Sequence, residues 1–472
     1  MKVLLVTHDL GFADPLAIAC LSPIAKEMGH QTFFCALDSG EFIPTVEAIK
    51  PDVIGYSVNV IGFKKTIEAN HKAAKVHKFV SIMGGPHPTF SPETFTESGM
   101  DAYCVGEGEY PFRDFLKKVE KGASFDDVAN LITRNKTNPI RPFISNLDEF
   151  PMPDRDLVFT STNLRYSSRK IFVVSRGCPF KCAYCYNSYY RKIYQGKGPA
   201  VRRFGVERII REIEDVKNKY RMDFVKFSDD CFAFKADDWL EEFAEKYSTR
   251  IGVPFNCYLR VDTINENILK LLRKAGCYSV MLSVDSVSRH IREDILKREM
   301  LREDIIERLR KIREYGINTV VNYMLAVPGS TLQDDLDTIT FSKKARVTYP
   351  SYTTTVPMKN TDLYSYATDV QHIDPEYLKS DMSDIVERSP LPCFSEKEKD
   401  IRYNILLLGA LILKLPFPLD RLAVSLLKVI PPNILFKKIN DFIVSYSYSH
   451  SIFKLKKDNL TSPRVFKQSG AK

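Results

Sequence analysis

Short apolar runs alternate with helical patterns along the first 137 residues. The runs have the length of buried strands, and the stretches between them repeat apolar positions at helical spacing. We expect strands at 3–6, 31–35, 53–57, 79–83 and 102–105. Strands and helices that alternate at this interval form a parallel sheet covered on both faces. The pattern therefore predicts an α/β, flavodoxin- or Rossmann-like domain over residues 1–137.

A proline-rich stretch and a second α/β pattern follow. Four prolines between 138 and 170 interrupt any regular element and predict a linker. The alternation then returns over 171–369, with longer helices. Strands are expected at 171–175, 224–227, 255–259, 280–284, 319–327 and 352–356. Six such units predict a partial (β/α)6 TIM-type barrel, open on one side, whose active site lies at the carboxyl ends of its strands.

The alternation is lost in residues 370–472, which predict a helical, apolar and basic extension. Residues 401–472 hold 12 Lys/Arg and 3 Asp/Glu, so the whole net charge of +9 lies there. The apolar run 405–413 is too short to span a bilayer, which needs about 20 helical residues. Further apolar segments follow at 422–430 and 442–444, each edged by lysine or arginine. We expect this extension to lie in plane on an anionic membrane surface. Packing on the open side of the barrel, with lysines in solvent, remains the alternative.

Composition narrows the functional classes. The chain has 472 residues, of which 44% are hydrophobic and 27% charged, as in globular proteins of two domains or more. It begins directly with the first expected strand, without the features of a signal peptide. We therefore expect a cytoplasmic protein, peripheral to the inner face of the membrane if the extension binds there. The first 400 residues carry no net charge, so no nucleic acid partner is expected.

Three of the ten cysteines are closely spaced. Cys178, Cys182 and Cys185 form a CxxxCxxC pattern directly after the strand expected at 171–175. Three thiolates hold three irons of a four-iron cluster, which leaves the fourth iron open to another ligand. The alternative is a zinc knuckle, but structural zinc prefers four ligands and no fourth cysteine or histidine follows at close spacing. The pattern therefore favours a [4Fe–4S] cluster.

This cysteine motif resembles that of radical S-adenosylmethionine (SAM) enzymes. The spacing, the placement after a strand and the aromatic Tyr184 before the last cysteine all match, and the resemblance covers about residues 165–357. It implies a [4Fe–4S] cluster and SAM as cofactors, with reductive cleavage of SAM to a deoxyadenosyl radical. It also implies an electron donor of the flavodoxin or ferredoxin type.

The same resemblance implies further SAM contacts near the ends of later strands. The positions are Asp229, Asp230, Asp285, Arg298 and Gly329. The two acceptors Asp229 and Asp230 suit the methionine ammonium group; the alternative is an N-cap for the helix expected near residue 236. Arg298 matches an arginine that clamps the methionine carboxylate, or else is a solvated charge at a helix end. Many relatives carry glutamate where this chain has Asp285.

The N-terminal loops resemble the cobalamin-binding domain that precedes many radical SAM barrels, over roughly residues 1–120. The residues that carry the likeness follow the third, fourth and fifth strands: Ser57, Gly84, Gly85, Gly106 and Glu107. The resemblance implies cobalamin as a third cofactor. Domains that donate an axial histidine carry an aspartate two residues before it, where this chain has Val6 before His8. Without that aspartate to orient the imidazole, we do not expect His8 to bind cobalt.

The resemblance implies a cobalamin-dependent radical SAM enzyme, most often one that methylates an unactivated carbon, here of a small or lipid-like substrate. One alternative is cyclisation, oxidation or rearrangement without methyl transfer. A second is a methylthiotransferase, whose second cluster would need cysteines such as Cys20, Cys35 and Cys104. A third is a non-catalytic cobalamin-binding regulator, which would have no use for an open iron.

Overall fold

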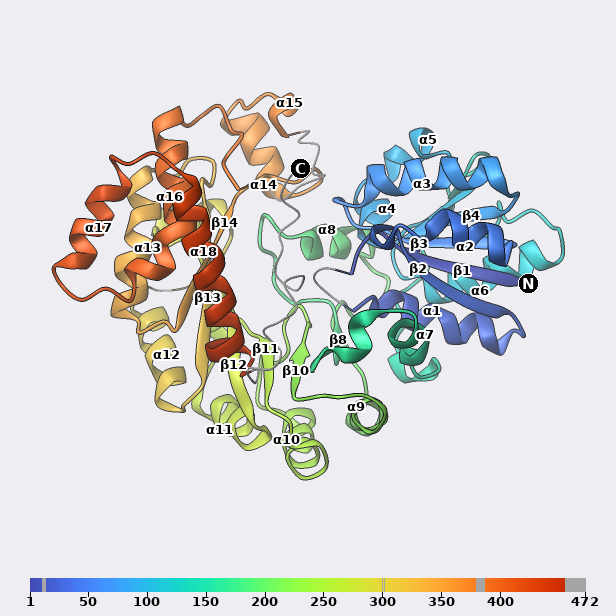
Figure 1. Ribbon diagram of the computed structural model, residues 1–472, viewed down its shortest axis with the longest axis horizontal. Helices are drawn as coiled ribbons and strands as arrows, with labels where there is room; N and C mark the ends of the chain where they lie inside the picture. Colours follow the sequence, from blue (N-terminus) through green and yellow to red (C-terminus); the bar gives the residue numbers. More distant parts are fainter. Residues whose placement is uncertain (11–13, 299, 301, 379–386, 455–472) are drawn as a thin grey trace.

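The computed structural model describes residues 1–10, 14–298, 300, 302–378 and 387–454. Two six-stranded sheets follow one another along the chain, and a helical extension completes the second (Figure 1). The predicted α/β class and the order of its parts are confirmed.

The first sheet has the order β2-β1-β3-β4-β5-β6. Its strands are β1 (Lys2–Thr7), β2 (Gln31–Ala36), β3 (Val53–Ser57), β4 (Val80–Gly84), β5 (Ala102–Cys104) and β6 (Leu131–Thr133). The first five are parallel; β6, which the sequence pattern did not predict, pairs with β5 in the antiparallel direction. The longer helices are α1 (Leu16–Glu27), α2 (Phe42–Ile49), α3 (Phe63–Val76) and α6 (Glu109–Glu120).

Alternation of side chains builds two cores around this sheet. Val3 and Leu5 pack with residues of α1 and α6, whereas Leu4 and Val6 pack with residues of α2 on the other face. A strand buried on both faces has no polar side of its own. This is why β1 reads as a continuous apolar run.

The second sheet is parallel throughout and has the order β14-β13-β12-β11-β10-β7. Its strands are β7 (Arg169–Phe172), β10 (Phe224–Phe227), β11 (Phe255–Tyr258), β12 (Cys277–Asp285), β13 (Asn318–Leu325) and β14 (Tyr349–Thr354). The helices between them are α9 (Val206–Lys219), α10 (Asp238–Lys246), α11 (Glu266–Ala275), α12 (Arg302–Glu314) and α13 (Leu332–Lys344). Since β7 and β14 are both edge strands, the sheet forms a partial barrel, as predicted.

The connection between the sheets is more regular than predicted. Its prolines were expected to exclude regular structure, but a short helix, α7 (Arg155–Thr160), forms there. The Asp154 side chain caps it by accepting a hydrogen bond from the Leu157 amide at 3.2 Å. The buried Arg155 binds Glu212 of α9 at 2.6 Å, which fixes the helix against the second sheet.

The C-terminal extension closes the open side of the partial barrel. It contains α16 (Glu396–Ile412), α17 (Leu419–Leu427) and α18 (Ile434–Ser447). Helix α16 packs on β14, α13 and α18, and α18 crosses in front of the second sheet (Figure 1). Gly409 permits this approach, because a Cβ there would lie 2.5 Å from the Tyr352 ring.

The expected membrane role of the run 405–413 is wrong. Ile405, Leu407, Leu408 and Ile412 are buried within the protein, so this run faces the barrel, which was the alternative. No helix of the described residues is long and apolar enough to cross a membrane. The basic residues after 454 that entered the charge argument lie outside the described residues.

We expect Ile405→Ala to lower the free energy of unfolding by about 2–5 kcal/mol, because it opens a cavity in a packed core. Leu422→Ala, on an exposed position of α17, is the control and should change it by less than about 0.5 kcal/mol. Chemical denaturation of both variants measures the difference. Equal, small effects would show that α16 does not belong to the core.

Candidate functional site

A cavity of about 460 Å³ lies where the carboxyl ends of the two sheets face each other. The first sheet contributes Ser57, Gly84 and Gly85, and the second contributes Ser228 and Asp230. Ligands of parallel α/β sheets bind at the carboxyl ends of strands. The cavity is therefore the place where ligands of both sheets would meet.

The first-sheet side of the cavity leaves room for a bulky group. A Cβ on Gly84 would meet only the Cys104 Cβ, at 3.7 Å, so no side chain fills the space before it. The Ser57 hydroxyl lines the cavity and makes no hydrogen bond within the described residues. Gly85 is needed for another reason: its φ is +99°, and a Cβ would lie 3.0 Å from the Val58 backbone.

The next two predicted contacts, Gly106 and Glu107, have structural roles. The Tyr194 hydroxyl lies against Gly106 and accepts a hydrogen bond from the Glu107 amide at 2.9 Å. The Glu107 carboxylate accepts from Arg202 at 2.8 Å and from the Ile144 amide at 2.8 Å. Glu107 thus joins the two domains. Gly106 and Glu107 also line the cavity, so their contacts with cobalamin stay predictions.

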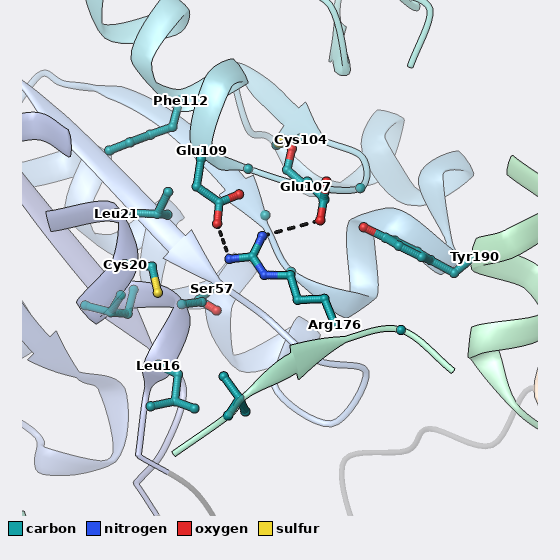
Figure 2. Close-up of a pocket in the computed structure, with 18 of the residues that line it drawn as sticks. Leu16, Cys20, Leu21, Ser57, Cys104, Glu107, Glu109, Phe112, Arg176 and Tyr190 are labelled. Carbon is teal, nitrogen blue, oxygen red and sulfur yellow. Dashed lines mark hydrogen bonds and ion pairs between the residues drawn. The ribbon is translucent and has the colours of Figure 1, made fainter. Parts of the chain in front are cut away.

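Arginine side chains connect the two domains across the cavity (Figure 2). Arg176, on β8 (Ser175–Arg176), binds Glu109 and reaches Glu107 at 3.3 Å. Arg202 lies on the paired strand β9 (Arg202–Arg203) and is also buried. Burial raises the pKa of Glu109, but the Arg176 charge outweighs it and the pKa lies below its ordinary value. The Glu109 carboxylate therefore stays ionised and paired with Arg176.

His8 lies outside the residues that line the cavity. Its ring packs over Gly62, and its Nε2 atom is 2.9 Å from the Asp9 carboxylate. Asp9 thus pairs with the imidazole, and the expectation that His8 does not bind cobalt stays a prediction. Gly11, part of the same loop motif, lies outside the described residues.

The cysteine loop follows β7 and β8 on the barrel side. Cys182 is buried, and Cys178 and Cys185 are half-buried. Neighbouring backbone holds the loop: the Ala183 amide donates to Leu296 O at 3.0 Å, and Ala183 O accepts from the Leu363 amide at 2.9 Å. No three His, Cys, Asp or Glu side chains of the described chain share a single-ion geometry. A four-iron cluster differs, because each thiolate binds its own iron.

Two guanidinium groups lie beside the Cys182 thiol. Arg260 Nη1 is 3.4 Å and Arg298 Nη1 is 3.5 Å from its sulfur. Arg260 also lies 3.9 Å from the centre of the Phe180 ring and binds Asp262 at 2.7 Å. N–H donors at this distance can donate hydrogen bonds to the sulfur of a cluster ligand. The donor set therefore fits an iron–sulfur cluster.

Tyr184, Asp285 and Arg298 form one network. The Tyr184 hydroxyl donates to Asp285 at 2.7 Å, and Arg298 lies 2.8 Å from the same carboxylate. The Ser283 hydroxyl donates a hydrogen bond to the other oxygen of the Asp285 carboxylate. Asp285 has a φ of +63°, next to a register shift at the end of β12. A non-glycine residue rarely adopts this conformation unless its surroundings impose it. The network holds Arg298 against Cys182, and the contacts of Asp285 and Arg298 with SAM stay predictions.

Asp229 and Asp230 differ in role. Asp229 is buried and accepts from the Val174 and Ser175 amides at 2.9 and 2.6 Å. Burial raises its pKa to about 6. Asp230 is exposed and lines the cavity, so it is the freer acceptor for an ammonium group. Neither caps a helix, because α10 begins at Asp238 and its cap is Asp237.

Gly329 allows close packing after β13. Its φ is +88°, and a Cβ would lie 2.8 Å from the Tyr366 hydroxyl and 3.0 Å from Ile295. The turn is thus tightly enclosed by residues after β12 and β14. A backbone contact to a ligand remains a prediction at this position.

Comparison with known proteins agrees with this two-domain geometry. The B12 binding domain model matches residues 2–116, and the radical SAM superfamily model matches residues 172–342. The chain belongs to the radical SAM enzymes that carry a B12-binding domain. Cobalamin, SAM and a [4Fe–4S] cluster are the cofactors of this B12-binding radical SAM protein, and the residues described above fit them.

Several relatives share most of this organisation. An uncharacterized methyltransferase of Pyrococcus horikoshii is 26% identical over 78% of this chain and 83% of its own length. The anaerobic magnesium-protoporphyrin IX monomethyl ester cyclase of Rubrivivax gelatinosus is 23% identical over 61% of this chain and 53% of its own. The solved structure of the radical SAM methyltransferase TsrM from Kitasatospora setae has a TM-score of 0.63 at 16% identity, covering 74% of this chain and 72% of that one.

A second cluster in the N-terminal domain has no support in the B12-binding radical SAM protein. Cys104 belongs to the core on the α1 and α6 side of the sheet, whereas Cys35 belongs to the core on the opposite side. Cys20 lies on α1. The three thiols that a methylthiotransferase would need are therefore divided between two faces.

The sequence did not single out the residues that join the domains. Arg176 stands directly before the cysteine motif and Arg202 lies on a two-residue strand. Their partners are 69 and 95 residues away in the chain. The adjacency of Arg176 to the motif was the one available signal.

We expect Cys182→Ala to abolish reductive cleavage of SAM and to lower the iron content, because one iron loses its thiolate. Cys393→Ala, at an exposed cysteine outside the motif, is the matched control and should keep both. Iron analysis and deoxyadenosine release from anaerobically reconstituted protein measure the two effects. Normal cleavage by Cys182→Ala would contradict the assignment.

We expect His8→Ala to bind cobalamin with an unchanged visible spectrum, because His8 is not among the residues that line the cavity. Gly84→Leu should lower the cobalamin content, because the added side chain enters the cavity. Absorbance of the purified, cobalamin-loaded variants separates the two. A shifted spectrum for His8→Ala would identify the imidazole as a cobalt ligand.

Proposed function

We propose that this protein is a cobalamin-dependent methyltransferase that methylates an unactivated carbon of a small or lipid-like substrate. One observation carries the proposal: the cavity between the domains is lined by the loops that suit cobalamin and by the strand ends that precede and follow the cysteine loop. Both cofactors would thus face the same space. When bound, they supply reductive cleavage of SAM and a methyl group for transfer.

The chain's own residues position these groups and exclude water. Cys178, Cys182 and Cys185 hold the cluster, and Arg298, held by Asp285, keeps a positive charge beside Cys182. Asp230 accepts from the methionine ammonium group. The ion pairs of Arg176 and Arg202 with Glu107 hold the strand ends of the two domains together beside the cavity. Fixed charges in a closed site need no reorganisation during reaction.

The barrel interior supports a substrate with a negative group. On β10, Val225 and Phe227 pack against the outer helices, so Lys226 points into the barrel. Its Nζ lies 5.4 Å from the Tyr258 ring centre, and burial lowers its pKa to about 8. It pairs with no carboxylate within 4.0 Å among the residues described. A half-buried cation without a partner is costly to desolvate further, and a substrate carboxylate or phosphate would supply that partner.

The names of the relatives agree with this substrate class. The cyclase of Rubrivivax gelatinosus is named for a magnesium-protoporphyrin ester, and a relative from Streptomyces wedmorensis for a cytidylyl-phosphonate that it methylates. The cyclase keeps a second outcome open, namely ring formation without methyl transfer. A methylthiotransferase is disfavoured by the divided cysteines, and a non-catalytic regulator by the complete cysteine motif.

The proposal assigns a part of the chain to each task. Residues 1–137 form the cobalamin-binding domain, 138–170 the linker, 171–369 the radical SAM barrel and 370–472 the extension. A flavodoxin- or ferredoxin-type donor would supply the electron for the cluster. We place the protein in the cytoplasm.

Growth of the source organism on methyl-labelled methionine tests the proposal. We expect a labelled metabolite that disappears when Cys182→Ala replaces the native chain, because SAM cleavage is lost. Gly84→Leu should also lose that metabolite but retain SAM cleavage in the purified protein, because it affects only the cobalamin side. A product that differs from its precursor by a ring and carries no label would establish the cyclase alternative.

A further inference from the structure

Exposed apolar side chains are concentrated on one part of the surface. Of the 15 large hydrophobic residues that are exposed among those described, ten lie between residues 417 and 446. We define the α17 stripe as Phe417, Leu419, Leu422, Leu426 and Val429. Apolar patches of this kind on a folded protein mark interaction surfaces.

The spacing places the stripe on one side of α17. Leu419, Leu422 and Leu426 follow at intervals of three and four residues, and Val429 continues the stripe in the next turn. Residues at this spacing share a helix face. Val429 is 79% and Phe417 69% exposed. The stripe therefore forms a continuous apolar ridge on α17. Helix α17 itself lies at the outer edge of the molecule (Figure 1).

The opposite side of α17 is fixed to the protein. Leu427 is buried, and Asn404 of α16 donates to Leu427 O at 3.1 Å and to Ile430 O at 2.7 Å. Asp420 pairs with Lys343 of α13. These contacts show that α17 already packs on the protein through its inner side. The exposed stripe is therefore not a surface that the fold needs for its own core.

Positive charge borders the stripe. Arg421 and Lys428 lie on the adjoining side of α17, and Lys438 is exposed on α18. None of the three forms an ion pair within the described part of the chain. The single carboxylate of α17, Asp420, is neutralised by Lys343. An exposed apolar ridge with a basic border is the pattern of a helix lying in a lipid interface.

We propose that the α17 stripe docks the protein onto an anionic membrane surface, with Phe417, Leu422 and Val429 inserted between lipids and Arg421 and Lys428 among the head groups. A second copy of the chain fits less well, since a two-fold contact would bring the same unpaired cations together. The segment differs from the run 405–413, which is buried. The proposal stands apart from the methyl-transfer proposal, because docking requires no chemistry.

Flotation of the full-length holoenzyme with vesicles tests the proposal. We expect the protein to float with phosphatidylglycerol–phosphatidylcholine vesicles at low salt, to be partly released at high salt, and to stay behind with phosphatidylcholine alone. The double variant Leu422→Asp/Val429→Asp should lose flotation, and Arg421→Glu/Lys428→Glu should lose it at low salt. Val76→Asp, at a 45% exposed apolar position of α3, should float like the native protein.

Three results would overturn the proposal. The native protein remains with the soluble fraction, the Leu422→Asp/Val429→Asp variant floats unchanged, or the native protein is a dimer that this variant converts to a monomer without any vesicle binding. The substituted positions are exposed, and unchanged circular dichroism and iron content confirm that each variant is folded. Vesicle binding without methyl transfer would leave this inference intact while refuting the proposed function.

Discussion

The buried ion pairs between Glu107, Glu109, Arg176 and Arg202 are the interaction on which the site depends. They span the two domains at the carboxyl ends of both sheets. A buried pair adds little net stability over apolar contacts, but removal of one partner costs about 3–5 kcal/mol, because it leaves a charge unpaired. Relative motion of the domains would separate these charges. The pairs therefore specify one arrangement of the domains and, with it, the shape of the cavity.

Two consequences for chemistry follow from that arrangement. The strand ends of each domain face the other domain rather than bulk water, so the cavity is bounded by protein on both sides. The amino ends of the second sheet are also covered, because Ser279 of β12 donates to Ile452 O at 2.7 Å and Phe453 lies over Arg169 of β7 at 4.7 Å. Protein on both sides of the cavity and at the base of the barrel limits the access of water to the site.

Hydrophobic periodicity predicted most strands, but it did not predict the side-chain contacts that join distant parts of the chain. Strands β3 and β10 begin and end at the predicted residues, because their apolar runs are bounded by polar ones. The cysteine motif was equally readable, since its spacing is local. The roles of Glu107 and Asp285 could not be read from the sequence. Glu107 pairs with arginines that lie 69 and 95 residues away, and Asp285 depends on an unusual backbone conformation at the end of β12. The run 405–413 was misassigned for a related reason: apolar composition does not reveal whether protein or lipid covers it.

The C-terminal extension shows how one segment serves two surfaces. Helix α16 is buried, with Arg402 paired to Asp335 of α13 at 2.6 Å inside the protein, and so completes a barrel that β14 would otherwise leave with an exposed edge. Helix α17 differs from α16, because its apolar residues lie on the outer side, toward solvent. Its inner side is held to the protein by Asn404. The buried helix is the rigid base that keeps the outer one in place.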